Sequence, residues 1–269
     1  MSHFTISCTT CSLRGASSDE VLATFEYAPK AGYFAWGIAG PPLWNVGGWR
    51  WFDGKKVKRM ADDAGLHICT EVYGPGVPND KFSEQDVIDF AGMFEVAVDL
   101  ESPLVVMTGR GRKEGTEPLD YVVDFLNALD PKLDQFDAML ALEPHYGSQL
   151  QTADDYRYIF SRIKSQNIGI TVDTGHFYSA GVDIPAFIRE FGDNIINVHL
   201  KDHIGKQSVP IGTGEIPIKE IVKALDEIDY EGALAVEIEP EDPPMLPQYC
   251  RDALVYLRGV VKEVTGQNA

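Results

Sequence analysis

Four apolar runs in the second half of the chain each end in a side chain that can bind a metal ion or transfer a proton. The runs LALE, ITVD, NVHL and LAVE carry Glu143, Asp173, His199 and Glu237. Three carboxylates and an imidazole without partners would repel one another and would be costly to remove from water. A divalent cation removes that cost, and an oxygen-rich set with one imidazole favours Mn²⁺, with Mg²⁺, Co²⁺ or Zn²⁺ as alternatives. We therefore predict one divalent-metal site.

The elements that carry these side chains must bring them to one place. Most of the β-rich runs are too apolar to have a solvated face, and amphipathic helical patterns such as 83–100 and 152–167 separate them. Such strands indicate a parallel sheet covered by helices. The sequence contains eight of these runs, at 4–7, 33–39, 67–73, 103–109, 138–144, 168–174, 195–202 and 233–240.

Eight strand–helix units in 269 residues match the size of a (β/α)8 TIM barrel, which is the predicted fold. All strand ends of a parallel barrel open onto one face, so the four side chains would converge there. An open doubly wound sheet is the alternative, but no GxGxxG follows the first strand. No linker or low-complexity segment divides the chain, so we expect residues 1–269 to form a single domain.

The composition narrows the range of partners. The chain has 41 acidic and 23 basic residues and a formal charge of −18, which disfavours nucleic acid as a partner. The sequence contains no apolar run of about 18 residues, so we expect no transmembrane helix. The first residues lack the layout of a signal peptide, so we expect a cytoplasmic protein. The partner expected is a small molecule.

Two further local patterns can be explained without a functional role. Cys8 and Cys11 form a single CxxC without a second pair, which favours reduced structural cysteines over a zinc site. The segment 37–54 is rich in Gly, Pro and Trp, and Trp44, Trp49 and Trp51 could form a substrate lid or an oligomer contact. An ordinary ordered loop explains it equally well. We expect a homo-oligomer, and a different partner subunit stays open.

The motifs LEPH, VDTGH, VHLKD, GTGEIP (212–217) and VEIE together resemble the xylose isomerase-like barrel superfamily, in particular its sugar-phosphate isomerase/epimerase branch. The resemblance covers most of the chain and is strongest over 138–240. It implies that Glu143, Asp173, His199 and Glu237 bind one divalent metal. It further implies that His176 contacts a substrate oxygen, and that the two glutamates are the acid/base pair of an epimerase.

Ketose epimerisation and aldose–ketose isomerisation both remove a proton beside a carbonyl and need a cation to stabilise the resulting enediolate. We therefore predict a metal-dependent isomerase or epimerase of a free or phosphorylated ketose or keto-sugar. The family's 3-epimerases usually place an Arg where this chain has Gly205. Lys201 or His203 could replace it. The departure favours an alternative, a metal-dependent lyase or dehydratase that acts by elimination on a keto-sugar or keto-inositol, including 3-keto-glycoside cleavage.

Two more classes remain as alternatives. A phosphodiesterase barrel needs more metal ligands and a basic DNA-binding face, whereas the chain has six His and a charge of −18. A non-catalytic sugar-binding barrel does not require two flanking glutamates.

Several other side chains near the strand ends are candidates for substrate contact. Lys201 would share the face of His199 by strand alternation, unless it is an exposed lysine at the strand end. His145 follows Glu143 by two residues and is predicted to touch substrate. Glu71 could face the cavity or the surface. Arg110 and Arg112 could bind an anion, although a solvated loop explains them better.

Overall fold

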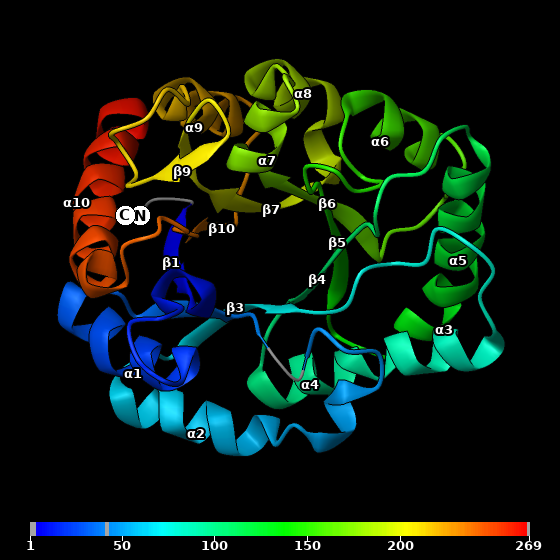
Figure 1. The fold of residues 1–269 in the computed structure, drawn as a ribbon, viewed down its shortest axis with the longest axis horizontal. Coiled ribbons are helices and arrows are strands. Elements are labelled where there is room, and N and C mark those ends of the chain that lie inside the picture. The colour runs from blue at the N-terminus through cyan, green and yellow to red at the C-terminus, as the bar shows by residue number, and fades with distance from the viewer. Residues whose placement is uncertain (1–3, 41–42, 268–269) are drawn as a thin grey trace.

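The computed structural model describes residues 4–40 and 43–267. Eight parallel strands close into a barrel and the helices surround it (Figure 1). The barrel order is β1-β10-β7-β6-β5-β4-β3-β2. The predicted (β/α)8 barrel is therefore confirmed. Its strands are β1 (Thr5–Thr9), β2 (Ala35–Ile38), β3 (Ile68–Tyr73), β4 (Leu104–Thr108), β5 (Met139–Glu143), β6 (Ile168–Asp173), β7 (Ile195–Leu200) and β10 (Ala233–Val236).

The outer ring consists of amphipathic helices that bury one face against the barrel. Ser83 and Thr152 cap α3 and α6 with capping boxes, as the sequence predicts. The helices are α1 (Glu20–Ala31), α2 (Gly54–Ala64), α3 (Glu84–Ala91), α4 (Met93–Leu100), α5 (Glu117–Leu133), α6 (Ala153–Phe160), α7 (Thr174–Ser179), α8 (Ile184–Phe191), α9 (Ile218–Glu227) and α10 (Leu246–Thr265). No helix in the described ranges is both long and apolar enough to cross a membrane.

Two helical patterns are shorter than the sequence predicts. The pattern over 83–100 breaks into α3 and α4 at Gly92, where an added Cβ would lie 2.1 Å from Trp49 Cε2. The indole of Trp49 therefore occupies the space that a side chain at position 92 would need. The pattern over 152–167 ends at Phe160. A two-stranded hairpin after β7, formed by β8 (Asp202–Ile204) and β9 (Gln207–Val209), was not predicted.

The interior of the barrel carries a polar layer below the strand ends. Thr70 Oγ1 donates to Ser7 Oγ at 3.1 Å, and Asn197 and Thr171 are fully buried nearby, with Asn197 Nδ2 3.4 Å from Thr171 Oγ1. Buried polar groups in folded proteins are nearly always hydrogen-bonded. This layer connects the apolar core to the carboxyl ends of the strands, where the side chains capable of chemistry lie.

Candidate metal centre and active site

The four side chains at the strand ends come together. Glu143 and Asp173 are the last residues of β5 and β6, His199 lies near the end of β7, and Glu237 follows β10. The register pairs Asp173 with His199. One ligand-type atom from each of the four lies within 4.8 Å of the others, and no member is more than 7% exposed. The parallel barrel thus brings together residues that are up to 94 positions apart.

The atoms at the centre are suited to a cation. His199 Nδ1 lies 2.6 Å from Glu143 Oε1, 2.9 Å from Glu237 Oε2 and 3.9 Å from Asp173 Oδ2. Asp173 Oδ2 and Glu237 Oε2 are buried and accept no hydrogen bond from the residues that the structure describes. Carboxylate oxygens that accept no hydrogen bond are costly to bury. The cluster can therefore hold a divalent cation through oxygen and imidazole ligands.

The pKa values of His199, Glu143 and Glu237 are shifted from their ordinary values. Burial alone would lower the pKa of His199, but the carboxylates of Glu71, Glu237 and Glu143 raise it well above 6.5. Burial raises the pKa of Glu143. Burial acts in the same direction on Glu237, but nearby Lys201 and His199 bring its pKa well below 4.5. The pKa values of the two glutamates are thus shifted in opposite directions.

A pocket of about 310 Å³ opens above this cluster. Glu143, His145, His176, Lys201 and Glu237 all line it. The rings of His145 and His176 lie 3.9 Å apart between centroids, and Lys201 Nζ lies 3.4 Å from His176 Nε2. Burial and then Lys201 lower the pKa of His176 to about 3, so its imidazole is neutral at pH 7. The predicted substrate-contact residues thus share one cavity.

Lys201 is not an exposed lysine at a strand end. Its side chain is 2% exposed and its ammonium lies 3.3 Å from Asp173 Oδ2, 3.4 Å from Glu237 Oε1 and 3.0 Å from Glu239 Oε2. Burial would lower its pKa, but Asp173, Glu237 and Glu239 raise it well above 10.5. Glu71 does not face the surface, which was one of its two predicted positions. It is 2% exposed and its Oε2 lies 2.8 Å from His199 Nε2.

Two other groups that could have bound an anion, the arginines after β4 and the backbone of the GTGEIP segment, already have partners within the chain. Arg112 forms a bidentate pair with Asp155 at 2.9 and 3.1 Å, whereas Arg110 donates to the carbonyl of Gly76. The backbone N–H groups of Gly212 and Gly214 in the GTGEIP segment donate to Asp202 Oδ2 at 2.9 and 2.8 Å. That segment is therefore a turn organised around a buried carboxylate.

Sequence reasoning missed two side chains that touch the proposed ligands. The Tyr73 hydroxyl donates to Glu143 Oε2, and the Cys11 thiol donates to Glu237 Oε1 at 3.2 Å. Both line the pocket. Tyr73 ends a strand, like the four predicted ligands, and that position is the signal that could have found it. Cys11 lies in a 3-10 turn after β1. No local sequence pattern indicates that its thiol contacts Glu237, and only the three-dimensional structure shows this contact.

The segment 37–54 contributes one indole to this pocket. Trp44 lines the cavity, and the guanidinium of Arg14 lies over its ring at 4.7 Å. Trp49 packs at Gly92, and Trp51 is 86% exposed. Residues 41 and 42 of the segment lie outside the described ranges.

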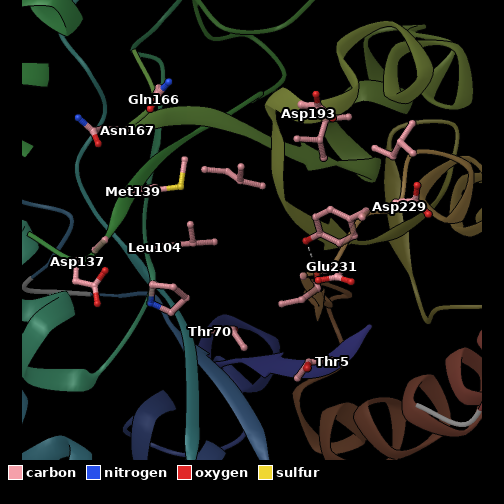
Figure 2. A pocket seen from close by; sticks show the side chains of 18 of the residues that line it. Thr5, Thr70, Leu104, Asp137, Met139, Gln166, Asn167, Asp193, Asp229 and Glu231 are labelled. Atoms are coloured by element: carbon pink, nitrogen blue, oxygen red, sulfur yellow. Dashed lines mark hydrogen bonds between the residues drawn. The ribbon is translucent and has the colours of Figure 1, made fainter. Parts of the chain in front are cut away.

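A larger cavity of about 840 Å³ lies at the opposite, amino-terminal end of the barrel (Figure 2). The acidic residues in its lining lie in the loops that precede strands, and they are Asp137, Asp193, Asp229 and Glu231. The described lining contains no His, Cys, Lys or Arg. Conserved chemistry in such barrels is placed at the carboxyl ends of the strands, and the other end serves stability. The smaller pocket is therefore the candidate active site.

Comparison with known proteins agrees with this architecture. Residues 25–258 match the family described as xylose isomerase-like TIM barrel. An inosose dehydratase from Clostridium beijerinckii is 28% identical over 170 residues, which are 56% of this chain and 56% of that protein. The chain thus spans little more than half the length of that relative.

Solved structures share the whole fold. A structure of IOLI protein with a bound zinc atom superposes with a TM-score of 0.80 at 19% identity and covers 98% of this chain and 100% of that one. A D-tagatose 3-epimerase-like protein gives a TM-score of 0.77 at 20% identity, with 99% of each chain covered. With a family match over residues 25–258, the chain belongs to the xylose isomerase-like TIM barrel family.

Proposed function

We propose that the protein is a divalent-metal-dependent isomerase or epimerase of a ketose or keto-sugar that works through an enediolate. The observation that carries the proposal is the convergence of three buried carboxylates and one imidazole nitrogen beneath a pocket of about 310 Å³, with two of the carboxylate oxygens accepting no hydrogen bond from the described residues. Glu143, Asp173, His199 and Glu237 would hold the metal. When bound, the cation supplies charge stabilisation for the oxygens of the substrate.

Glu143 and Glu237 are the proposed acid/base pair. Their carboxylates approach His199 Nδ1 from different strands, β5 and the end of β10, and both line the pocket. One carboxylate takes the proton from the carbon beside the carbonyl, and the C–H electron pair moves toward the carbonyl oxygen. The other carboxyl returns a proton, to the opposite face of the same carbon in epimerisation or to the neighbouring carbon in isomerisation.

His176, Lys201 and His145 are the proposed substrate contacts. The Lys201 ammonium can donate to His176 Nε2, which leaves the ring Nδ1–H of His176 as a donor for a substrate hydroxyl. The resulting row of donors lies beside the two glutamates and would orient the sugar. Such positioning is a substantial part of the barrier reduction in proton-transfer enzymes.

The charges around the pocket favour an uncharged sugar over a sugar phosphate. The two cations of the pocket are already paired, Lys201 with three carboxylates and Arg14 with Glu20 at 2.9 Å. Asp202 occupies the backbone N–H groups of the turn that follows the β8–β9 hairpin, where phosphate could otherwise bind. A phosphate dianion would have to displace these carboxylates.

A lyase or dehydratase is the second candidate, and the residue at position 205 favours it. Elimination removes a proton beside the carbonyl and expels a hydroxyl group, which leaves as water after it receives a proton. Lys201 supplies a hydrogen-bond donor within the pocket for that step. Gly205 stands where the related epimerases usually carry an Arg, and the relative from Clostridium beijerinckii is an inosose dehydratase.

Product analysis separates the two candidates. The Mn²⁺-loaded protein is incubated with D-fructose, D-tagatose, 2-keto-myo-inositol and a 3-keto-glucoside, and with the 6-phosphates of the two ketoses. An epimer or isomer of an unphosphorylated substrate supports the first proposal, and loss of water or of an aglycone supports the second. Conversion of the phosphates alone contradicts the expectation of an uncharged substrate. No conversion of any compound, with Mn²⁺ shown to be bound, contradicts both candidates.

A further inference from the structure

Each of the four proposed ligands has one atom that is turned away from the shared centre and held by another group. His176 N donates to Asp173 Oδ1 at 2.7 Å, as expected where Asp173 caps α7. The corresponding atoms of the other three ligands meet Tyr73 and Glu71, which both lie on β3, and Cys11, which lies in the turn after β1. All four ligands are thus held in the same manner, with one atom fixed and the other facing the centre.

Glu71 holds the imidazole from inside the barrel. Its Oε2 lies 2.8 Å from His199 Nε2 and also accepts from the side chain of Asn197. Space for this carboxylate exists because residue 37 is a glycine, where an added Cβ would lie 2.6 Å from Glu71 Cγ. A carboxylate that accepts from Nε2–H fixes the tautomer in which Nδ1 carries the lone pair. Nδ1 is the nitrogen that faces the three other ligands.

Tyr73 and Cys11 hold the two glutamates in an equivalent way. The phenol of Tyr73 donates to Glu143 Oε2 and leaves Oε1 facing His199. The thiol of Cys11 donates to Glu237 Oε1 and leaves Oε2, which has no hydrogen bond from the described residues, at the centre. Each donor therefore fixes one carboxylate oxygen and directs the other toward the position where a cation would bind.

We propose that Glu71, Tyr73 and Cys11 are positioning residues, which set the metal site to bind a divalent cation through His199 Nδ1 and through one oxygen of each carboxylate. The inference rests on the proposed metal-dependent function and specifies how the site achieves it. One-oxygen binding by three carboxylates and one nitrogen uses four positions. These four atoms are the ones that face the shared centre and would hold the cation, which would supply positive charge beside the substrate.

Metal binding tests this proposal without any substrate. Mn²⁺ is titrated into metal-free protein, and the free-ion signal is followed by electron paramagnetic resonance. Glu71→Ala should weaken Mn²⁺ binding by about 10- to 100-fold, the usual effect of losing such a partner, and Glu71→Gln should recover part of it because its amide oxygen still accepts from Nε2–H. Tyr73→Phe and Cys11→Ala should weaken binding by about 3- to 30-fold, and Cys11→Ser should retain the wild-type affinity.

Matched controls separate positioning from general damage to the fold. Tyr156→Phe removes a buried hydroxyl that donates to the carbonyl of Leu142, and Cys69→Ala removes a buried thiol near the carbonyl of Glu71. Both should bind Mn²⁺ as the wild type does. In Co²⁺-loaded protein, Tyr73→Phe should shift the visible absorption bands, because the geometry around the ion changes, whereas Tyr156→Phe should not.

The outcomes distinguish this inference from the proposed function. If the folded variants Glu71→Ala, Tyr73→Phe and Cys11→Ala all bind Mn²⁺ within about twofold of the wild type, the positioning proposal is wrong even if the enzyme is active. If Glu71→Ala does not fold, Tyr73→Phe with its Co²⁺ spectrum decides the same question. A wild-type protein that binds Mn²⁺ but converts no ketose refutes only the function. A wild-type protein that binds no Mn²⁺, Co²⁺ or Zn²⁺ refutes both.

Discussion

Replacing Lys201 with Met should destabilise the metal-free protein strongly. The ammonium is 2% exposed and lies within 3.0–3.4 Å of Asp173, Glu237 and Glu239. Removal of one partner from a buried ion pair usually costs about 3–5 kcal/mol, because the other charge stays buried without compensation. For a domain of this size that loss lowers Tm by roughly 10 °C.

A divalent cation should reverse much of this loss. With Lys201 absent, the bound ion is the main positive charge near these carboxylates, so Mn²⁺ should raise Tm by more in the variant than in the wild type. The assay is thermal unfolding followed by circular dichroism, in excess EDTA and in excess Mn²⁺. Lys219→Met is the control, since its pair with Glu263 is solvent-exposed and should contribute little to stability.

The reasoning is refuted if Lys201→Met unfolds in EDTA within about 2 °C of the wild type. That result would mean that the carboxylates are neutralised by bound protons and do not depend on the ammonium. A large loss that Mn²⁺ does not reduce would instead mean that the lysine stabilises the fold at a place the ion does not reach.

Three further expectations follow from the site. Glu143→Gln and Glu237→Gln should each lower kcat by about 10²–10⁴-fold, and full activity of both would show that the acid/base assignment is wrong. Because the pKa of His199 lies well above 6.5 without metal, binding of Mn²⁺ must displace its proton. The affinity measured by calorimetry should therefore rise by up to about tenfold per pH unit from pH 6 upward, and an affinity independent of pH would contradict this. Gly37→Ala should push the carboxylate of Glu71 away from His199, since the new Cβ would lie 2.6 Å from its Cγ, and should weaken Mn²⁺ binding by about tenfold.

The sequence was sufficient to predict the barrel because its strands carry a strong local signal. Apolar runs recur with helical patterns between them, and seven of the eight predicted runs contain a barrel strand, whereas the run 4–7 overlaps β1, which extends to Thr9. The convergence of Glu143, Asp173, His199 and Glu237 then follows from topology, since parallel strands end on one face. Their roles in metal binding and catalysis remain proposals.

The rest of the site depends on distances that no local pattern encodes. Glu71 lies two residues before the end of β3, and whether it points inward depends on the space that Gly37 leaves in the neighbouring strand. Cys11 reaches Glu237 across 226 residues of sequence. Lys201 followed the predicted alternation, but its burial is possible only because three carboxylates surround it. Tertiary partners, which a single sequence does not show, determine each of these positions.

Solvent-deuterium exchange tests the central proposal most directly. The protein is incubated in D₂O with a ketose or a keto-inositol, with Mn²⁺ or with EDTA, and the carbon beside the carbonyl is followed by NMR. We predict that deuterium enters at that carbon only with metal present, and that Glu143→Gln and Glu237→Gln abolish the exchange. The absence of exchange in Mn²⁺-loaded wild-type protein across the ketoses and keto-inositols would contradict proton abstraction as the function of this site.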